Sequence, residues 1–126
     1  MRTRVLVLDD QEYLRDIIAA ILDDAGFPSL AVGTTDEALR RLDELHPELL
    51  VLDMSLPEMS GLQFLEHLRA KPAWRTLPVV MVSGDPGMLT PVYGRPNVVA
   101  LTKPFDVNVL VDEVTRLLGP ALTHSA

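Results

Sequence analysis

Two kinds of hydrophobic segment alternate along this chain. The first kind is a short continuous apolar run, rich in Val and Leu, in which polar and apolar residues do not alternate. Four such runs occupy residues 5–8, 49–52, 78–82 and 98–102. Runs of this kind are typical of strands that are buried on both faces, as in a parallel sheet. Residues 29–32 form a weaker candidate, which we expect at an edge of the sheet.

The stretches between these runs have the apolar spacing of amphipathic helices. Their stripes fall within residues 14–25, 38–45, 62–68 and 107–118. The pairs Thr34/Glu37 and Ser60/Gln63 have the spacing of a capping box, and Asp106 can cap the last helix. Stripes of Leu, Ile and Val at this spacing indicate helix faces that pack against a core.

Strands that alternate with helices imply βαβ units with right-handed crossovers and a parallel sheet. We therefore predict an α/β fold in which a doubly wound, five-stranded sheet carries helices on both faces. No internal repeat or linker divides the 126 residues, which fit one domain spanning residues 1–119. Residues 120–126 are predicted to be a C-terminal tail or the stump of a linker.

The segment 84–97 departs from this regular alternation. A fourth helix is due there, yet the segment contains Pro86, Pro91 and Pro96 together with three glycines. Proline inside a helix costs about 3 kcal/mol, and glycine about 1 kcal/mol, relative to alanine. We predict that the fourth helix is short, irregular or absent.

Composition and charge restrict the possible functions. The chain has 11 basic and 18 acidic residues, a formal net charge of −7, which argues against binding of nucleic acid by this domain alone. The absence of cysteine excludes disulfides and thiolate chemistry. The four apolar residues before Asp9 are too few for a signal peptide core or a membrane span. We expect a cytoplasmic protein that does not contact the membrane.

Polar or charged side chains follow or end each of the four apolar runs. In chain order they are Asp9 with Asp10, then Asp53, Ser83 and Lys103. Ligands of open α/β sheets bind at the carboxyl ends of the strands, so we expect these side chains to meet there. Taken singly, each would be interpreted as a turn residue, a helix cap or a surface lysine. Their joint occurrence indicates a site.

The chemistry of this set favours phosphoryl transfer to an aspartate. Clustered carboxylates repel each other unless a cation such as Mg²⁺ neutralises them. A lysine adds a compact positive charge for a phosphoryl oxygen, and a serine adds a hydrogen-bond donor. Phosphoryl transfer depends mainly on positioning and charge neutralisation, and a carboxylate can itself be the nucleophile.

The same residues resemble those of the response-regulator receiver domains of two-component signalling. The resemblance extends from Arg4 to about Leu118. It rests on VLDDQ at residues 7–11, DMSLPEMSG at residues 53–61 and KPF at residues 103–105. It implies the CheY-like, flavodoxin-like sheet with strand order 2-1-3-4-5.

The resemblance also implies roles for individual residues. Asp53 matches the phosphoacceptor of the family. Asp9 and Asp10 match its acidic pair, which binds Mg²⁺ (or Mn²⁺) together with Asp53 and the backbone carbonyl of Ser55. Lys103 matches the residue that contacts the phosphoryl group, and the family resemblance implies that the bond to Pro104 is cis. Ser83 matches the switch hydroxyl.

The resemblance is incomplete in the part of the chain that transmits the signal. Family members usually carry Tyr or Phe three residues before the lysine, where this chain has Ala100. One hypothesis is that Tyr93 supplies the missing ring. Together with the broken segment 84–97, this substitution leaves the readout mechanism open.

The partner implied by the resemblance is a sensor histidine kinase or a histidine phosphotransfer protein. Such a partner would dock around the strand-end loops and the first helix, where Gln11 and Leu14 are candidate contacts. The signal would pass to a downstream protein or to an output domain outside this sequence. The domain would not be an enzyme beyond its own phosphorylation and autodephosphorylation.

Two other classes of protein compete with this interpretation. A degenerate receiver would act as an interaction module without phosphorylation, but such proteins lose the acidic pair, the acceptor or the lysine, and all are present here. A phosphatase of the haloacid dehalogenase type needs a second aspartate two residues after the nucleophile. Ser55 occupies that position, so this class fits poorly.

Overall fold

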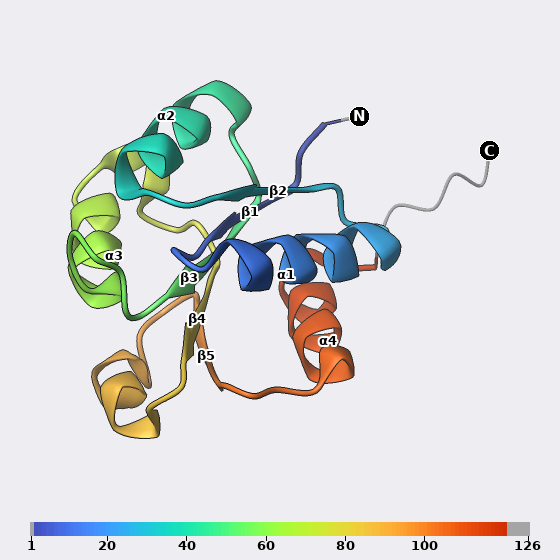
Figure 1. The fold of residues 1–126 in the computed structure, drawn as a ribbon. Coiled ribbons are helices and arrows are strands. Elements are labelled where there is room, and N and C mark those ends of the chain that lie inside the picture. The colour runs from blue at the N-terminus through green and yellow to red at the C-terminus, as the bar shows by residue number, and fades with distance from the viewer. Residues whose placement is uncertain (1, 121–126) are drawn as a thin grey trace.

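Five short strands form one parallel sheet in the computed structural model, which describes residues 2–120 (Figure 1). The strands are β1 (Val5–Leu8), β2 (Ser29–Val32), β3 (Leu49–Asp53), β4 (Val79–Ser83) and β5 (Val98–Thr102). Their order across the sheet is β2-β1-β3-β4-β5, and every neighbouring pair is parallel. The predicted fold class and strand order are confirmed, and β2 lies at an edge as expected.

Helices cover both faces of this sheet (Figure 1). The α-helices are α1 (Glu12–Asp24), α2 (Thr35–Leu45), α3 (Gly61–Arg69) and α4 (Val107–Leu118), and the 3₁₀ helices are η1 (Pro72–Trp74) and η2 (Pro86–Val92). Helices α1 and α4 share one core cluster with the sheet, whereas α2, α3 and η2 share the other. Within residues 2–120, no helix has both the length and the apolar character that crossing a membrane requires.

The continuous apolar runs are explained by these two cores. In β1, Val5 and Val7 lie in the cluster with α1 and α4, whereas Leu6 and Leu8 lie in the cluster with α2 and α3. All four side chains are fully buried. Successive side chains of a strand point to opposite faces, so a strand covered on both sides needs apolar residues at every position.

The predicted helix caps are formed to different extents. Ser60 and Gln63 make the complete capping box of α3, in which each side chain accepts a hydrogen bond from the backbone N–H of the other residue. At α2 only half of the predicted box forms, because Thr34 accepts from the N–H of Glu37 without the reciprocal bond. Asp106 caps α4 by accepting from the N–H of Asn108.

The segment after β4 has the short, irregular form that its prolines predicted. It is the 3₁₀ helix η2, which contains Pro91 and is capped by the Asp85 side chain through the N–H of Gly87. Leu89 and Val92 of η2 are buried in the core shared with α2 and α3. The fourth helix is therefore shortened and tightened, but it still covers its part of the sheet.

Candidate functional site

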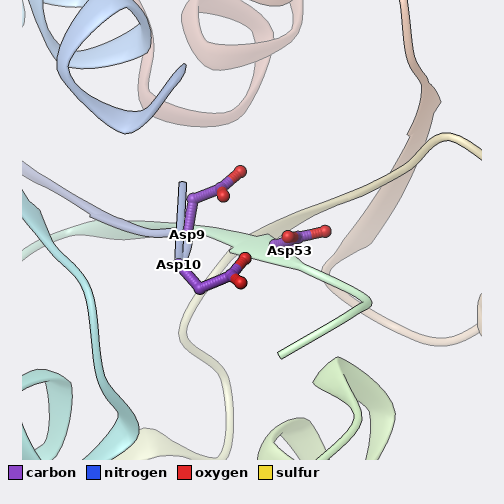
Figure 2. A group of neighbouring side chains, drawn as sticks. All are labelled: Asp9, Asp10 and Asp53. Carbon is purple, nitrogen blue, oxygen red and sulfur yellow. The ribbon is translucent and has the colours of Figure 1, made fainter. Parts of the chain in front are cut away.

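Three carboxylates meet at the carboxyl ends of β1 and β3. Asp9 and Asp10 follow β1, and Asp53 is the last residue of β3, the strand that pairs with β1. Figure 2 shows the three side chains on this edge of the sheet, and their ligand oxygens all lie within 4.8 Å of one another. Asp9 and Asp53 are buried, with 2% and 6% of their surface exposed, whereas Asp10 is exposed.

Lys103 supplies the positive charge at this edge. Its Nζ lies 3.2 Å from Oδ2 of Asp9 and 3.6 Å from Oδ1 of Asp53. Its backbone N–H donates to the carbonyl of Ser83, which joins the ends of β4 and β5 at a distance of 2.7 Å. The Lys103–Pro104 peptide bond is cis, as expected. The lysine thus contacts two of the three carboxylates.

Ser83 ends β4 and is buried beside this cluster. Its hydroxyl accepts a hydrogen bond from the N–H of Asp85 at 3.0 Å and lies 3.2 Å from the Asp85 carbonyl. The hydroxyl is therefore engaged by the loop that leads into η2.

On the neighbouring strand, Ala100 packs half-buried against the core, and Tyr93 is 61% exposed just after η2. The hypothesis that Tyr93 supplies the aromatic ring that is missing at Ala100 stays a prediction.

A tight backbone contact fixes the loop that follows Asp53. The N–H of Gly61 donates to the carbonyl of Met54 at 2.7 Å, and Ser55 bridges to Ser60. A Cβ atom on Gly61 would lie 2.4 Å from the carbonyl oxygen of Asp53, a distance at which only glycine fits. Sequence reasoning used Gly61 as part of a motif but did not identify this steric role.

Arg15 is a second residue that the sequence did not single out. Its Nη1 donates to the backbone carbonyls of Asp9 and Asp10, at 3.4 Å in each case. The guanidinium lies against Gly33, where an added Cβ would stand 3.0 Å from Nη1. Arg15 therefore braces the loop that presents the acidic pair. Its place beside the apolar stripe of α1 gave no signal of this contact.

The electrostatics of the cluster favour a cation. Burial raises the pKa of Asp53, and the charges of Asp9 and, more weakly, Asp10 raise it further. The N–H of Ser55, which donates to Oδ1 of Asp53 at 3.2 Å, and the Lys103 ammonium act in the opposite direction on this pKa. Three carboxylates against one lysine leave a net negative charge, so the donor set fits a hard divalent cation.

A wide apolar groove lies next to the lysine. It has a volume of about 470 Å³ and runs between α1 and the loop from β5 to α4. Leu14, Ile17 and Ile21 line it from α1, and Pro104, Phe105 and Val107 line it from the other side. The groove places an unpartnered apolar surface directly beside the carboxylate cluster.

Comparison with protein families gives one match that spans most of the chain. The model of the response regulator receiver domain family matches residues 5–115. Over 120 residues the chain is 32% identical to the phosphate regulon transcriptional regulatory protein PhoB of Escherichia coli K12. The match covers 94% of this chain and 52% of PhoB, so the chain spans about half the length of that relative.

Solved structures agree with this match. The signal receiver domain of a signal transduction histidine kinase from Syntrophus aciditrophicus is 29% identical, with a TM-score of 0.81 over 98% of this chain and 96% of that one. The Vibrio cholerae chemotaxis protein CheY4 is 24% identical, with a TM-score of 0.80 over 94% of this chain and all of the other. At that level of identity the second likeness supports the fold alone.

Proposed function

This chain belongs to the response regulator receiver domain family, and we propose that it accepts a phosphoryl group on Asp53 from a phosphohistidine of a partner protein. The observation that carries the proposal is the convergence of three carboxylates and Lys103 at one edge of the sheet. That set combines a nucleophile, a cation site and a fixed positive charge. Phosphoryl transfer requires these parts in one place.

In the proposed reaction, a carboxylate oxygen of Asp53 attacks the phosphorus atom. The O–P bond forms while the P–N bond of the phosphohistidine breaks, and the electron pair remains on the imidazole nitrogen. Lys103, already 3.6 Å from Asp53, pairs with a phosphoryl oxygen. The Ser83 hydroxyl exchanges its contacts with Asp85 for another phosphoryl oxygen. Because Ser83 gives up its contacts with Asp85, formation of the acyl phosphate is coupled to the loop before η2.

The acidic residues provide the cation site in this proposal. Asp9, Asp10 and Asp53, with the backbone carbonyl of Ser55, would hold Mg²⁺ (or Mn²⁺), which supplies positive charge for the transferred phosphoryl group when bound. The burial of Asp9 and Asp53 keeps two of these carboxylates out of bulk water. Arg15 braces the backbone that carries the acidic pair.

The groove beside Lys103 is the proposed docking surface for the phosphodonor. A helix of a histidine kinase or phosphotransfer protein could lay an apolar face between α1 and the β5–α4 loop. Leu14 lines this groove, and Gln11 precedes α1 as its exposed N-cap residue. We propose a cytoplasmic switch that catalyses only its own phosphorylation and dephosphorylation. Its output passes to a downstream protein or to a further domain outside this sequence. PhoB, of which the match covers 52%, is long enough to contain such a domain.

The test is intact-mass spectrometry after incubation with acetyl phosphate and Mg²⁺. The wild type should gain one phosphoryl group, and Asp53→Asn should gain none, because the amide is not a nucleophile of comparable strength. Asp43→Asn, an exposed aspartate on α2, is the matched control and should label normally. Undiminished labelling of Asp53→Asn would overturn the assignment. An unlabelled wild type would favour a phosphorylation-independent interaction module.

A further inference from the structure

A second pocket lies at the opposite end of the sheet from the carboxylates. It has a volume of about 160 Å³ and is lined by Leu65, Arg69, Arg75, Arg95, Pro96 and Val98. Val98 begins β5 and Lys103 follows its end, so the length of the strand separates the two sites. A strand rises about 3.3 Å per residue, which makes this separation about 17 Å. We call these six residues the arginine pocket.

The three arginines of this pocket are only partly neutralised. Nη2 of Arg95 lies 3.4 Å from the carboxylate of Glu66, in a pair that is open to solvent. Arg69 donates to the backbone carbonyls of Trp74 and Asn97, which are uncharged acceptors. Within residues 2–120, the side chain of the exposed Arg75 makes no hydrogen bond or ion pair. Among residues 2–120, the Arg95–Glu66 contact is therefore the one ion pair that these three guanidinium groups form.

The environment of Arg69 shows that this charge is costly to hold. Burial lowers the pKa of Arg69, and the positive charge of Arg95 lowers it further. Arg69 lies in the last turn of α3, where the helix dipole favours a cation. This position explains the presence of one of the three arginines. It does not account for Arg75 or Arg95. Arg95 comes from the irregular segment after η2, and its Nε is fixed by the carbonyl of Pro91 at 3.1 Å.

We propose that the arginine pocket binds an acidic peptide segment of a protein partner, with an Asp or Glu carboxylate beside an apolar side chain. Guanidinium groups can bind a carboxylate through two parallel hydrogen bonds. Leu65, Pro96 and Val98 provide apolar walls for the neighbouring side chain. This site is separate from Asp53 and does not depend on the proposed phosphorylation.

Charge distribution favours an acidic peptide over nucleic acid. Nucleic-acid binding depends on an extended basic surface that contacts several phosphates. This chain has a net charge of −7, and three of its 11 basic residues are collected in one small pocket. A single pocket with apolar walls fits one carboxylate and its neighbour better than it fits a phosphate backbone.

The test is an NMR titration of ¹⁵N-labelled protein with the peptide acetyl-Glu-Leu-Glu-Leu-amide. The Nε–H signals of Arg69, Arg75 and Arg95 should shift, and the Gln-for-Glu peptide should bind much more weakly. The double variant Arg75→Gln/Arg95→Gln should lose affinity by about tenfold or more, because charge-assisted hydrogen bonds are lost. Arg69 is left intact, since it also donates to the backbone carbonyls of Trp74 in η1 and of Asn97 before β5. Arg40→Gln on α2 is the matched control.

Several outcomes would overturn the proposal. These are equal binding of the neutral peptide, undiminished binding by the double variant, or tighter binding of a single-stranded oligonucleotide than of the peptide. A competition experiment on the wild type needs no variant. Inorganic phosphate should displace the peptide, and NaCl of equal ionic strength is the control. Labelling of Asp53 by acetyl phosphate should be unchanged in the double variant, which separates this proposal from the phosphorylation proposal.

Discussion

Each end of the sheet carries an excess of one charge, which is negative at the carboxyl end and positive at the amino end of β5. At the carboxyl end, three carboxylates lie together, and the ammonium group of Lys103 contacts two of them, those of Asp9 and Asp53. At the amino end of β5, the arginine pocket holds three guanidinium groups, of which Arg95 pairs with the carboxylate of Glu66. Each end therefore has a surplus of one sign, which a ligand of the opposite sign can neutralise.

The pKa shifts at the two ends follow from the same physics with opposite sign. Burial and a like-charged neighbour raise the pKa of Asp53 and lower the pKa of Arg69, so both groups are pushed toward their neutral forms. The ends differ in how firmly they are built. Asp9 and Asp53 are buried and held by backbone contacts, whereas the Arg95–Glu66 pair is solvent-exposed. Charge removal should therefore have larger effects at the carboxyl end.

The largest expected effect comes from removing Lys103, whose ammonium group contacts Asp9 and Asp53. Lys103→Ala should slow labelling by acetyl phosphate by about 100-fold, the usual loss when one charge-stabilising donor of a transition state is removed. Stopped-flow or quenched labelling at saturating Mg²⁺ would measure the rate. Lys71→Ala alters the only other lysine of the chain and should label at the wild-type rate. Equal rates in both variants would show that Lys103 does not act on the phosphoryl group.

An intermediate effect is expected on stability. The raised pKa of Asp53 means that, between the ordinary carboxyl pKa and the folded value, the folded state binds more protons than the unfolded state. The free energy of unfolding therefore falls as pH rises through that window, and the penalty is complete above it. Asp53→Asn lacks this penalty and should be more stable than the wild type at pH 7.

Thermal melts from pH 3 to pH 8 would measure this difference. The gain from Asp53→Asn should shrink on acidification and vanish below about pH 3.9, the ordinary pKa of an aspartate. Mg²⁺ should raise the melting temperature of the wild type more than that of the variant. Asp43→Asn on α2 should show neither dependence. A gain that is constant with pH would assign the effect to packing instead.

The smallest effect is expected at the arginine pocket. Glu66→Gln removes an exposed ion pair, so the free energy of unfolding should change by about 0.5 kcal/mol or less. The same change removes the one carboxylate among residues 2–120 that pairs with an arginine of the pocket, so affinity for the acidic peptide should rise severalfold. Glu44→Gln, which breaks the exposed pair with Arg41 on α2, should leave that affinity unchanged. A loss of affinity in Glu66→Gln would contradict the charge argument.

The sequence was sufficient for the fold and for the carboxylate cluster. Continuous apolar runs specified strands buried on both faces, and the prolines at positions 86 and 91 predicted the shortened segment that became η2. The rule that ligands of open α/β sheets bind at the carboxyl ends of the strands then predicted that residues far apart in the chain, such as Asp9 and Lys103, form one site. The rule works because parallel strands bring their carboxyl ends to a common edge.

Features made by loops were outside the reach of sequence patterns. The contact of Gly61 with the Asp53 carbonyl, the brace from Arg15 and the half-formed cap at Thr34 all depend on local backbone paths. Neither periodicity nor spacing specifies those paths. The turn of the Ser83 hydroxyl toward Asp85 is of the same kind.

Sequence alone thus determined the strands, their order by family resemblance and the residues at their carboxyl ends. Only the tertiary structure decided that Arg69, Arg75 and Arg95 share a pocket. These arginines come from a helix end, a turn and an irregular loop, and no common sheet edge relates their positions. The physical reason is that hydrogen-bonded strands impose a register that sequence can reveal, whereas loops are placed by packing between elements that are distant in the chain.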